Sequence, residues 1–167
     1  MTFKYITHSN ILIGNGAVYN FLSNLDSFLT KKLLFIVDSG FAKSELWKKI
    51  NYSLKFQLKD NLNIIYSYNN SEPTYDMLDM LLADTKKINP DIIFALGGGS
   101  CMDQSKAVAA LLKNPGNPKI YKGFDKLKNK GATTILIPTT AGTGSEASFN
   151  ASFIDRKEMK KMGINGK

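Results

Sequence analysis

Four short runs of consecutive apolar residues recur along the chain, and more polar stretches separate them. The runs cover residues 33–37 (LLFIV), 62–66 (LNIIY), 91–96 (DIIFAL) and 133–137 (TTILI). Their hydrophobicity is continuous rather than alternating, which is typical of strands covered on both faces. We therefore expect these runs to form a mainly parallel sheet.

The stretches between the runs carry apolar residues at helical spacing. They predict helices over residues 41–54, 74–88 and 102–112. Pro73 is a start signal for the second helix, and Asn114-Pro115-Gly116 is a stop signal for the third. Strands that alternate with helices predict an α/β fold with a doubly wound sheet and right-handed crossovers.

The two ends of the chain predict smaller elements. Residues 11–16 (ILIGNG) predict a strand and a turn that lead into a helix over 17–29. The tail, 148–164, predicts a pair of strands that turns around Asp155-Arg156. A chain of 167 residues with 43% hydrophobic content buries one sizeable core but not two, so we expect a single domain over residues 1–167.

Charge and cysteine content narrow the class of protein. The net charge of +8 is dispersed in pairs such as Lys31-Lys32, with no basic run of five or more, which disfavours nucleic-acid binding and suits an anionic ligand. Cys101 is the single cysteine and fits a reducing cytoplasm. No stretch approaches the roughly 18 consecutive apolar residues that span a bilayer, so we expect a cytoplasmic protein without membrane segments.

A run of glycines is the strongest candidate for chemistry. Residues 96–103 (LGGGSCMD) follow the third strand and precede a helix. Glycines let backbone N–H groups approach a ligand, and the start of a helix favours phosphate. The alternative is a tight turn without a ligand, but a plain turn seldom needs three glycines.

A second loop, residues 137–146 (IPTTAGTGSE), follows the fourth strand. Its hydroxyls and N–H groups suit phosphate or ribose oxygens. Residues 142–147 also fit a degenerate dinucleotide fingerprint, but that fingerprint belongs after the first strand of its unit, so we do not count it.

Asp38 ends the first strand and has two interpretations that carry equal weight. A carboxylate there accepts hydrogen bonds from a ribose and repels a 2′-phosphate, which favours NAD over NADP. Alternatively, Asp38 caps the following helix through Ser39-Gly40.

Together, residues 97–109 (GGGSCMDQSKAVA) and 137–148 (IPTTAGTGSEAS) resemble the paired signatures of the iron-containing alcohol dehydrogenase family. That family shares its fold with dehydroquinate synthase and glycerol dehydrogenase. The resemblance covers essentially the whole chain. It implies the Rossmann-like N-terminal domain of a NAD-dependent alcohol or aldehyde oxidoreductase, without the helical C-terminal domain. Residues 114–129 are most similar to the branch that contains 3-deoxy-manno-octulosonate 8-oxidase.

The positions that match the family's cofactor-binding pattern are Asp38, Gly97, Gly98, Ser100, Asp103, Thr139, Thr140, Thr143, Ser145 and Lys161. The resemblance implies that the glycine loop with Ser100 contacts the pyrophosphate and that Asp103 lies near the nicotinamide. The second loop would line the stretch between them. Asp38 would lie at the adenosine end, and Lys161 would reach the nicotinamide ribose. Glu72-Pro73 replaces the family's Asn-Pro, which removes support for an adenosine contact there.

Catalysis is expected only in a complete member of the family. Such members bind iron or zinc through an aspartate and three histidines of the C-terminal domain. His8 is the single histidine here, and we expect a turn or surface role for it. We therefore expect catalysis to need that domain or a partner chain. We also expect the chain to self-associate through the apolar face that the domain would cover. The alternative is a stand-alone nucleotide-binding or assembly module without turnover.

Overall fold

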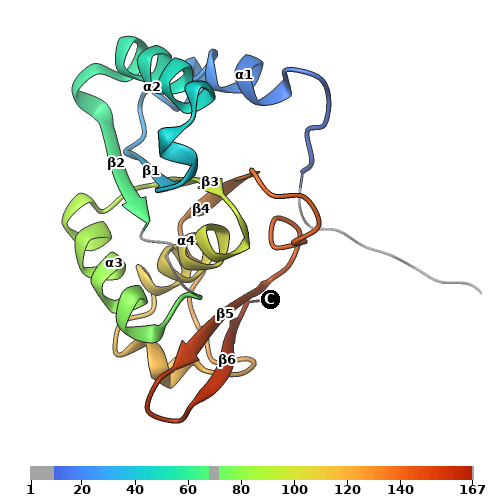
Figure 1. Ribbon diagram of the computed structural model, residues 1–167. Helices are drawn as coiled ribbons and strands as arrows, with labels where there is room; N and C mark the ends of the chain where they lie inside the picture. The colour runs from blue at the N-terminus through green and yellow to red at the C-terminus, as the bar shows by residue number, and fades with distance from the viewer. Residues whose placement is uncertain (1–9, 68–71, 167) are drawn as a thin grey trace, which may run out of the picture.

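The computed structural model describes residues 10–67 and 72–166 (Figure 1). Its main element is a four-stranded parallel sheet with the strand order β2-β1-β3-β4. The strands are β1 (Leu33–Asp38), β2 (Leu62–Ser67), β3 (Ile92–Gly97) and β4 (Thr133–Pro138). All four predicted strands and the parallel sheet are confirmed.

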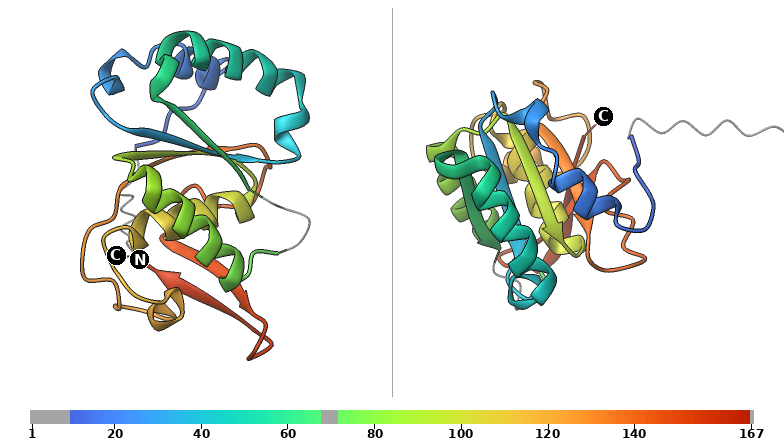
Figure 2. Two further views of the ribbon diagram at one scale, coloured as in Figure 1. Left: turned by 90° about the vertical axis from the view of Figure 1, so that its left-hand side faces the viewer. Right: turned by 90° about the horizontal axis from the view of Figure 1, so that it is seen from above.

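Helices cover both faces of the sheet, so it is doubly wound as expected (Figure 2). On one face lie α1 (Ala17–Leu22) and α2 (Glu45–Leu58), packed on apolar side chains such as Phe35 and Phe94. On the other lie α3 (Tyr75–Ile88) and α4 (Gly99–Leu111), packed on Leu34, Ile36 and Ile93. The alternation of faces along β1 and β3 thus divides the core into two layers.

Only the two central strands have the predicted burial on both faces. β1 is buried from Leu33 to Val37 and β3 along its whole length, whereas most positions of β2 and β4 are partly exposed. The expectation of full coverage was wrong for β2 and β4, because each is an edge strand with one neighbour in the described sheet.

Helix boundaries follow capping side chains. The Ser44 hydroxyl accepts a hydrogen bond from the N–H of Trp47, and α2 begins after it rather than at residue 41. The preceding residues form a short 3₁₀ helix, η2 (Phe41–Lys43), and another, η3 (Lys59–Asn61), follows α2. Thr74 caps α3 in the same way, close to the predicted start. α4 begins three residues earlier than predicted, so its first turn includes Gly99.

The predicted strand pair in the tail is confirmed as an antiparallel hairpin of β5 (Asn150–Asp155) and β6 (Lys160–Asn165). The hairpin packs beside α3 and α4. The N–H of Ile154 donates to the carbonyl of Pro73 at 2.8 Å, and the ring of Phe153 contacts that of Tyr75. A 3₁₀ turn, η4 (Pro118–Tyr121), lies before β4.

The N-terminal strand was predicted wrongly. Ile11, Leu12 and Ile13 pair with no strand among the described residues, and Ile13 is 88% exposed. The following helix is shorter than predicted, since α1 ends at Leu22 and the 3₁₀ helix η1 (Asp26–Phe28) comes next. Apolar character alone suggested a strand, but a strand also needs a neighbour for its backbone hydrogen bonds.

Candidate functional site

The carboxyl ends of β1 and β3 lie side by side at the point where the strand order reverses. β1 and β3 are neighbours, while β2 lies beyond β1 and β4 beyond β3. In an open parallel sheet this switch point leaves a crevice, and ligands bind outside the carboxyl ends of the strands there. Asp38 ends β1 and Gly97 ends β3, so both predicted site residues lie at this crevice.

The backbone at Gly97 is packed too closely to accept a side chain. An ideal Cβ at Gly97 would lie 2.6 Å from the Cβ of Cys101 and 2.8 Å from the Cβ of Asp38. The end of β1 and the first turn of α4 therefore converge on this residue. Glycine is required here for steric reasons, and the close approach holds the start of α4 against the sheet.

The two loops predicted separately from the sequence pack against each other. An ideal Cβ at Gly98 would lie 3.1 Å from Oγ1 of Thr140, and one at Gly99 would lie 3.4 Å from the Cβ of Thr143. In addition, the N–H of Thr139 donates to the carbonyl of Gly97 at 3.0 Å. Because Gly98 and Gly99 lack side chains, the backbone of the first loop lies close to the threonines of the second loop, and we call this junction of the two loops the cradle.

The start of α4 presents main-chain donors to this cradle. Gly98 is the N-cap residue, and no side chain caps the helix. The N–H groups of a first helical turn have no partners within the helix, and the helix dipole gives that end a partial positive charge. The first turn of α4 has no acidic residue to offset this charge. An anionic group with several oxygens suits such a surface.

The second loop is shaped by two left-handed glycines and by its own hydroxyls. Gly142 and Gly144 have φ values of 86° and 65°, a region that side chains rarely adopt. Oγ1 of Thr143 donates to Oε2 of Glu146 at 3.1 Å and accepts from the N–H of Ser145 at 3.3 Å. Of the hydroxyl residues in this loop, Ser145 alone is buried.

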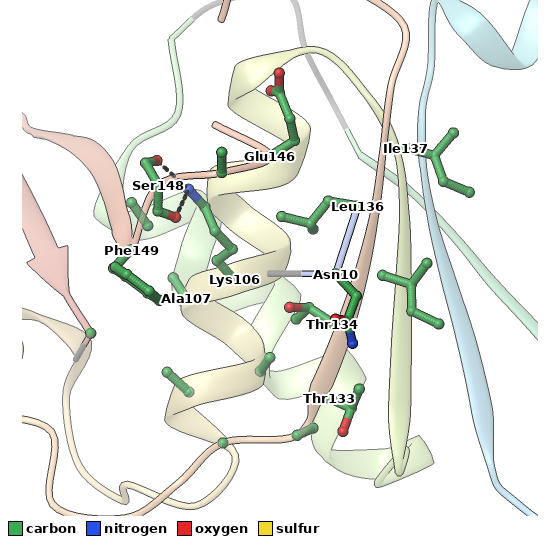
Figure 3. Close-up of a pocket in the computed structure, with 18 of the residues that line it drawn as sticks. Asn10, Lys106, Ala107, Thr133, Thr134, Leu136, Ile137, Glu146, Ser148 and Phe149 are labelled. Carbon is green, nitrogen blue, oxygen red and sulfur yellow. Dashed lines mark hydrogen bonds between the residues drawn. The ribbon is translucent and has the colours of Figure 1, made fainter. Parts of the chain in front are cut away.

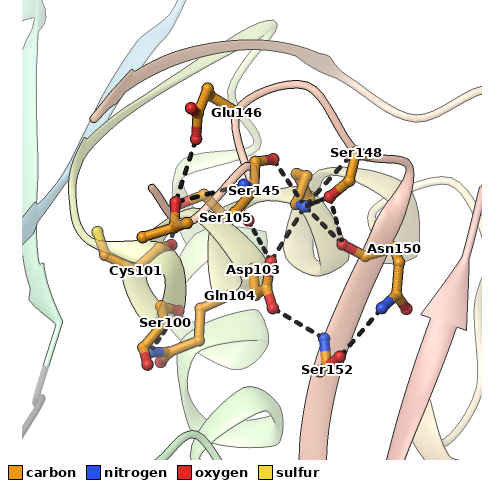
Figure 4. A network of polar contacts seen from close by, with 12 residues as sticks. Ser100, Cys101, Asp103, Gln104, Ser105, Ser145, Glu146, Ser148, Asn150 and Ser152 are labelled. Carbon is orange, nitrogen blue, oxygen red and sulfur yellow. Dashed lines mark hydrogen bonds and ion pairs between the residues drawn. The ribbon is translucent and has the colours of Figure 1, made fainter. Parts of the chain in front are cut away.

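Asp103 connects the second loop to the hairpin (Figure 4). The hydroxyl of Ser145 donates to Oδ1 of Asp103, and the N–H of Ser152 donates to Oδ2 at 3.0 Å. Lys106 forms an ion pair with the same carboxylate at 3.0 Å. Both oxygens of Asp103 therefore have partners within the chain, and its expected place near a nicotinamide stays a prediction.

Lys106 is the main residue of this region that the sequence interpretation missed. Its Nζ donates to the carbonyls of Ser145 and Asn150 and to Ser148. A signal was present, because Asp103 and Lys106 have the i, i+3 spacing of a helical ion pair. The sequence does not reveal, however, that the partners of Lys106 are mostly backbone carbonyls.

The capping interpretation of Asp38 holds only for the short helix η2, because the predicted longer helix, α2, is capped by Ser44. Oδ1 of Asp38 accepts a hydrogen bond from the N–H of Phe41 at 2.8 Å, at the start of η2. This contact fixes the carboxyl group at the end of β1, beside Gly97. The second role, toward a ribose, is compatible with that position and stays a prediction.

Cys101 is a buried structural thiol. Its Sγ lies 3.6 Å from the carbonyl oxygen of Ile36 and 3.7 Å from that of Leu96. Burial raises the pKa of the thiol to about 12, so it is protonated at neutral pH. Cys101 therefore contributes packing under the glycine loop rather than a nucleophile.

A large hollow of about 1430 Å³ runs along β4, but it is separate from the cradle (Figure 3). Its lining includes Leu136 of β4, Ala107 of α4 and Phe149. No residue from Gly97 to Asp103 contributes to this lining. The hollow therefore marks the partly open side of β4, whereas the candidate site lies at the carboxyl edge of the sheet.

Comparison with known proteins assigns the chain to a family. The sequence model of the family described as iron-containing alcohol dehydrogenase matches residues 8–167 of this chain. This chain belongs to the iron-containing alcohol dehydrogenase family. The resemblance carried by the two loop motifs is thereby confirmed.

Relatives match nearly all of this chain but less than half of their own length. Sulfoacetaldehyde reductase of Bilophila wadsworthia is 30% identical over 98% of this chain and 42% of its own. Alcohol dehydrogenase 4 of Schizosaccharomyces pombe is 31% identical over 96% and 37%, respectively. The chain thus spans about two fifths of the length of these iron-containing alcohol dehydrogenases.

Solved structures of the family share the fold. Sulfoacetaldehyde reductase from Bifidobacterium kashiwanohense, in complex with NAD+, aligns with a TM-score of 0.83 at 24% identity, over 100% of this chain and 44% of that one. An iron-containing alcohol dehydrogenase from Thermotoga maritima aligns with a TM-score of 0.80 at 24% identity, over 99% and 45%. The match confirms the expected α/β architecture of the family's N-terminal part.

The remaining sequence expectations concern Lys161, a metal site and His8. Lys161, on β6, pairs with Glu72 at 3.1 Å, and both side chains are more than half exposed. Its expected ribose contact stays a prediction. Within residues 10–67 and 72–166, no group of three or more His, Cys, Asp or Glu side chains could hold a metal ion. His8 lies outside the described residues.

The crowding at Gly97 predicts a cost for any side chain there. We expect Gly97→Ala to lower the free energy of unfolding by about 1–3 kcal/mol, the usual cost of overpacking. Gly14→Ala is the control, because nothing lies within 4 Å of its ideal Cβ; it should stay within about 0.5 kcal/mol of the wild type. Urea unfolding measures both, and equal stabilities for the two variants would contradict the close approach of α4 to the strand ends.

Proposed function

We propose that this chain is the cofactor-binding part of a NAD-dependent alcohol or aldehyde oxidoreductase. The observation that carries the proposal is the cradle between the two loops, where Cβ atoms at Gly98 and Gly99 would approach Thr140 and Thr143. Its position at the switch point of the sheet supports a dinucleotide, because two nucleotide halves extend along the strand ends on either side. The net charge of +8 favours an anionic ligand as well.

In this proposal, each side of the cradle has a separate task. The backbone of Gly97 and Gly98, with Ser100 and the first turn of α4, holds the pyrophosphate. Thr139, Thr140 and Thr143 offer hydroxyls along the path toward the nicotinamide. Ser145 and Asp103, which are hydrogen-bonded to each other, stabilise the nicotinamide end of the site. When bound, NAD supplies the hydride acceptor or donor of the reaction.

The proposal assigns the adenosine and ribose ends to charged side chains. Asp38, fixed by its contact with Phe41, faces the adenosine ribose. Lys161 reaches the nicotinamide ribose after its exposed ion pair with Glu72 opens, which costs little because such pairs contribute at most about 1 kcal/mol. Iron or zinc would act in a complete member of the family, and no step here is assigned to a metal.

The substrate is proposed only at the level of alcohols and aldehydes. The relatives carry names as different as sulfoacetaldehyde reductase and NAD-dependent methanol dehydrogenase. The branch that contains 3-deoxy-manno-octulosonate 8-oxidase, suggested by residues 114–129, stays a prediction. We also propose a cytoplasmic location. None of the helices among the described residues is long and apolar enough to cross a bilayer.

We propose that residues 1–167 fold as one domain. We also propose that another domain or chain covers its partly exposed side along β4. The partly exposed edge strand β4, the hollow beside it and the exposed Ile11–Ile13 stretch support this. The cover would be the helical domain of the family or a second copy of this chain. Light scattering would report self-association.

A second candidate function is a nucleotide-binding or assembly module without turnover. It is favoured by the site itself, where both carboxylate oxygens of Asp103 are hydrogen-bonded within the chain and the thiol of Cys101 is buried and protonated. Such a module would bind NAD but would not reduce it when the metal-binding C-terminal domain of a family member, alcohols and iron or zinc are added, whereas the cofactor-binding part of an oxidoreductase would. NADH absorbance therefore separates the two functions.

Binding of NAD is the first test. We expect NAD at a hundred times its Kd to stabilise the wild-type chain by about 2.7 kcal/mol. Gly98→Val should abolish this gain, because its side chain would fill the space beside Thr140. Gly14→Val, at an open position, should keep it. Thermal unfolding with and without NAD measures all three, and equal shifts for the two variants would remove the cradle from the site.

The preference for NAD over NADP is a separate prediction. Asp38→Asn removes the charge but keeps an oxygen that can accept from the N–H of Phe41. We expect its affinity for NADP to rise roughly tenfold, because a like charge a few ångströms from a 2′-phosphate costs about 1 kcal/mol or more. The exposed Asp60→Asn should change nothing. Calorimetric titration with both cofactors decides, and an unchanged ratio in Asp38→Asn would refute the ribose role.

A further inference from the structure

Lys106 is the side chain that joins α4 to the residues that follow the second loop, and Figure 3 shows it beside Ser148. Its Nζ lies 2.9 Å from the carbonyl oxygen of Ser145 and 2.5 Å from that of Asn150. The carbonyl and hydroxyl oxygens of Ser148 lie at 3.3 and 3.2 Å. Every one of these oxygens belongs to residues 145–150, which connect the loop to β5.

The lysine is well shielded from water. Its side chain is 12% exposed and that of Asp103 is 17% exposed. A shielded ammonium group is costly unless its charge and its three N–H bonds are satisfied. Here the carboxylate of Asp103 balances the charge, and the backbone oxygens of the segment accept the hydrogen bonds. Straightening or shifting the segment would leave the ammonium group unsatisfied.

Asp103 also holds this segment, together with the strand β5 that follows it. It accepts from the hydroxyl of Ser145 and from the N–H of Ser152. The first turn of the same helix contains Gly99, which packs on Thr143 of the second loop. The first turn of α4 therefore forms one side of the cradle. About two turns later, the same helix carries Lys106, which binds the residues that follow the second loop.

We propose that Lys106 is a positioning residue that sets the spacing between the two loops and so sets the affinity for a dinucleotide. This inference rests on the function proposed above. The lysine acts through the backbone of Ser145 and its neighbours, and it contacts no part of the dinucleotide. Its effect is therefore specific for ligands that span both loops.

A purely structural role gives a different expectation. If Lys106 only neutralised Asp103, then removing it would lower stability without discriminating between ligands. The positioning role predicts that a ligand touching one loop is unaffected, while a ligand that spans both is weakened. AMP reaches the first loop and the adenosine end, whereas NAD extends along the second loop as well.

The test compares three variants of the full chain. Lys106→Met keeps the length of the stem and removes the charge and the donors, and Lys106→Arg keeps both the charge and the donors. Lys48→Met is the matched control, because Lys48 is an exposed lysine that also pairs with an acid three residues away. Calorimetry measures the Kd of NAD and of AMP, and hydrogen exchange without ligand follows the amides of residues 139–150.

We expect Lys106→Met to weaken NAD at least tenfold, to change the Kd of AMP less than twofold, and to speed exchange in residues 139–150 but not in α2. Lys106→Arg should restore most of the NAD affinity, and Lys48→Met should match the wild type. Equal weakening of NAD and AMP, or unchanged exchange in 139–150, overturns the positioning role. Wild-type protein that binds AMP and NAD equally refutes the proposed two-loop site itself.

If Lys106→Met does not fold, Lys106→Gln carries the test, because its neutral amide still offers N–H groups to the segment while its stem is shorter and uncharged. We expect Lys106→Gln to weaken NAD more than AMP, and a Kd ratio of NAD to AMP identical to that of the wild type overturns the proposal.

Discussion

The first turn of α4 approaches the ends of β1 and β3 so closely that Gly97 has no space for a side chain. This contact determines where the helix begins, and with it the direction of the first N–H groups of α4, which have no partners within the helix. Cys101 fills the space beneath the turn with a buried thiol, and Asp38 borders it from β1. The candidate site depends on this approach, because the second loop packs on the glycines that the turn presents.

Two buried groups of charges then hold the rest of the chain around that turn. Asp103 and Lys106 connect α4 to residues 145–152. At the far end of the hairpin, Asp155 is buried between Lys122 and Lys119, and hydrogen bonding to Lys122 holds the pKa of its carboxyl well below its usual range. This second group remains ionised at every ordinary pH, so the hairpin is fixed at both ends.

The sequence was sufficient for features that depend on local pattern. The strands ending at Asp38 and Gly97 were predicted because their burial is continuous, and the two loops were recognised from glycines and hydroxyls at strand ends. The segment at Ile11–Ile13 was mispredicted because a strand also depends on a partner, which no local pattern specifies. Partial exposure of β2 and β4 likewise follows from their place at the edges of the sheet.

The role of Lys106 is of the same non-local kind. Its acceptors are oxygens 39 to 44 residues away, and most belong to the backbone, so no residue type in the sequence marks them. By contrast, the cap that Asp38 places on Phe41 spans three residues and was among the alternatives from the start. Distance along the chain, rather than burial, separates what sequence reasoning found from what required the structure.

The central claim is that a dinucleotide binds in the cradle between the two loops at the switch point of the sheet. Backbone amide chemical shifts recorded by NMR during a titration with NAD test it most directly. We predict that the largest changes fall on residues 97–101 and 139–145, with smaller ones near Asp38. Changes confined to the hollow along β4, or no changes at saturating NAD, would contradict it.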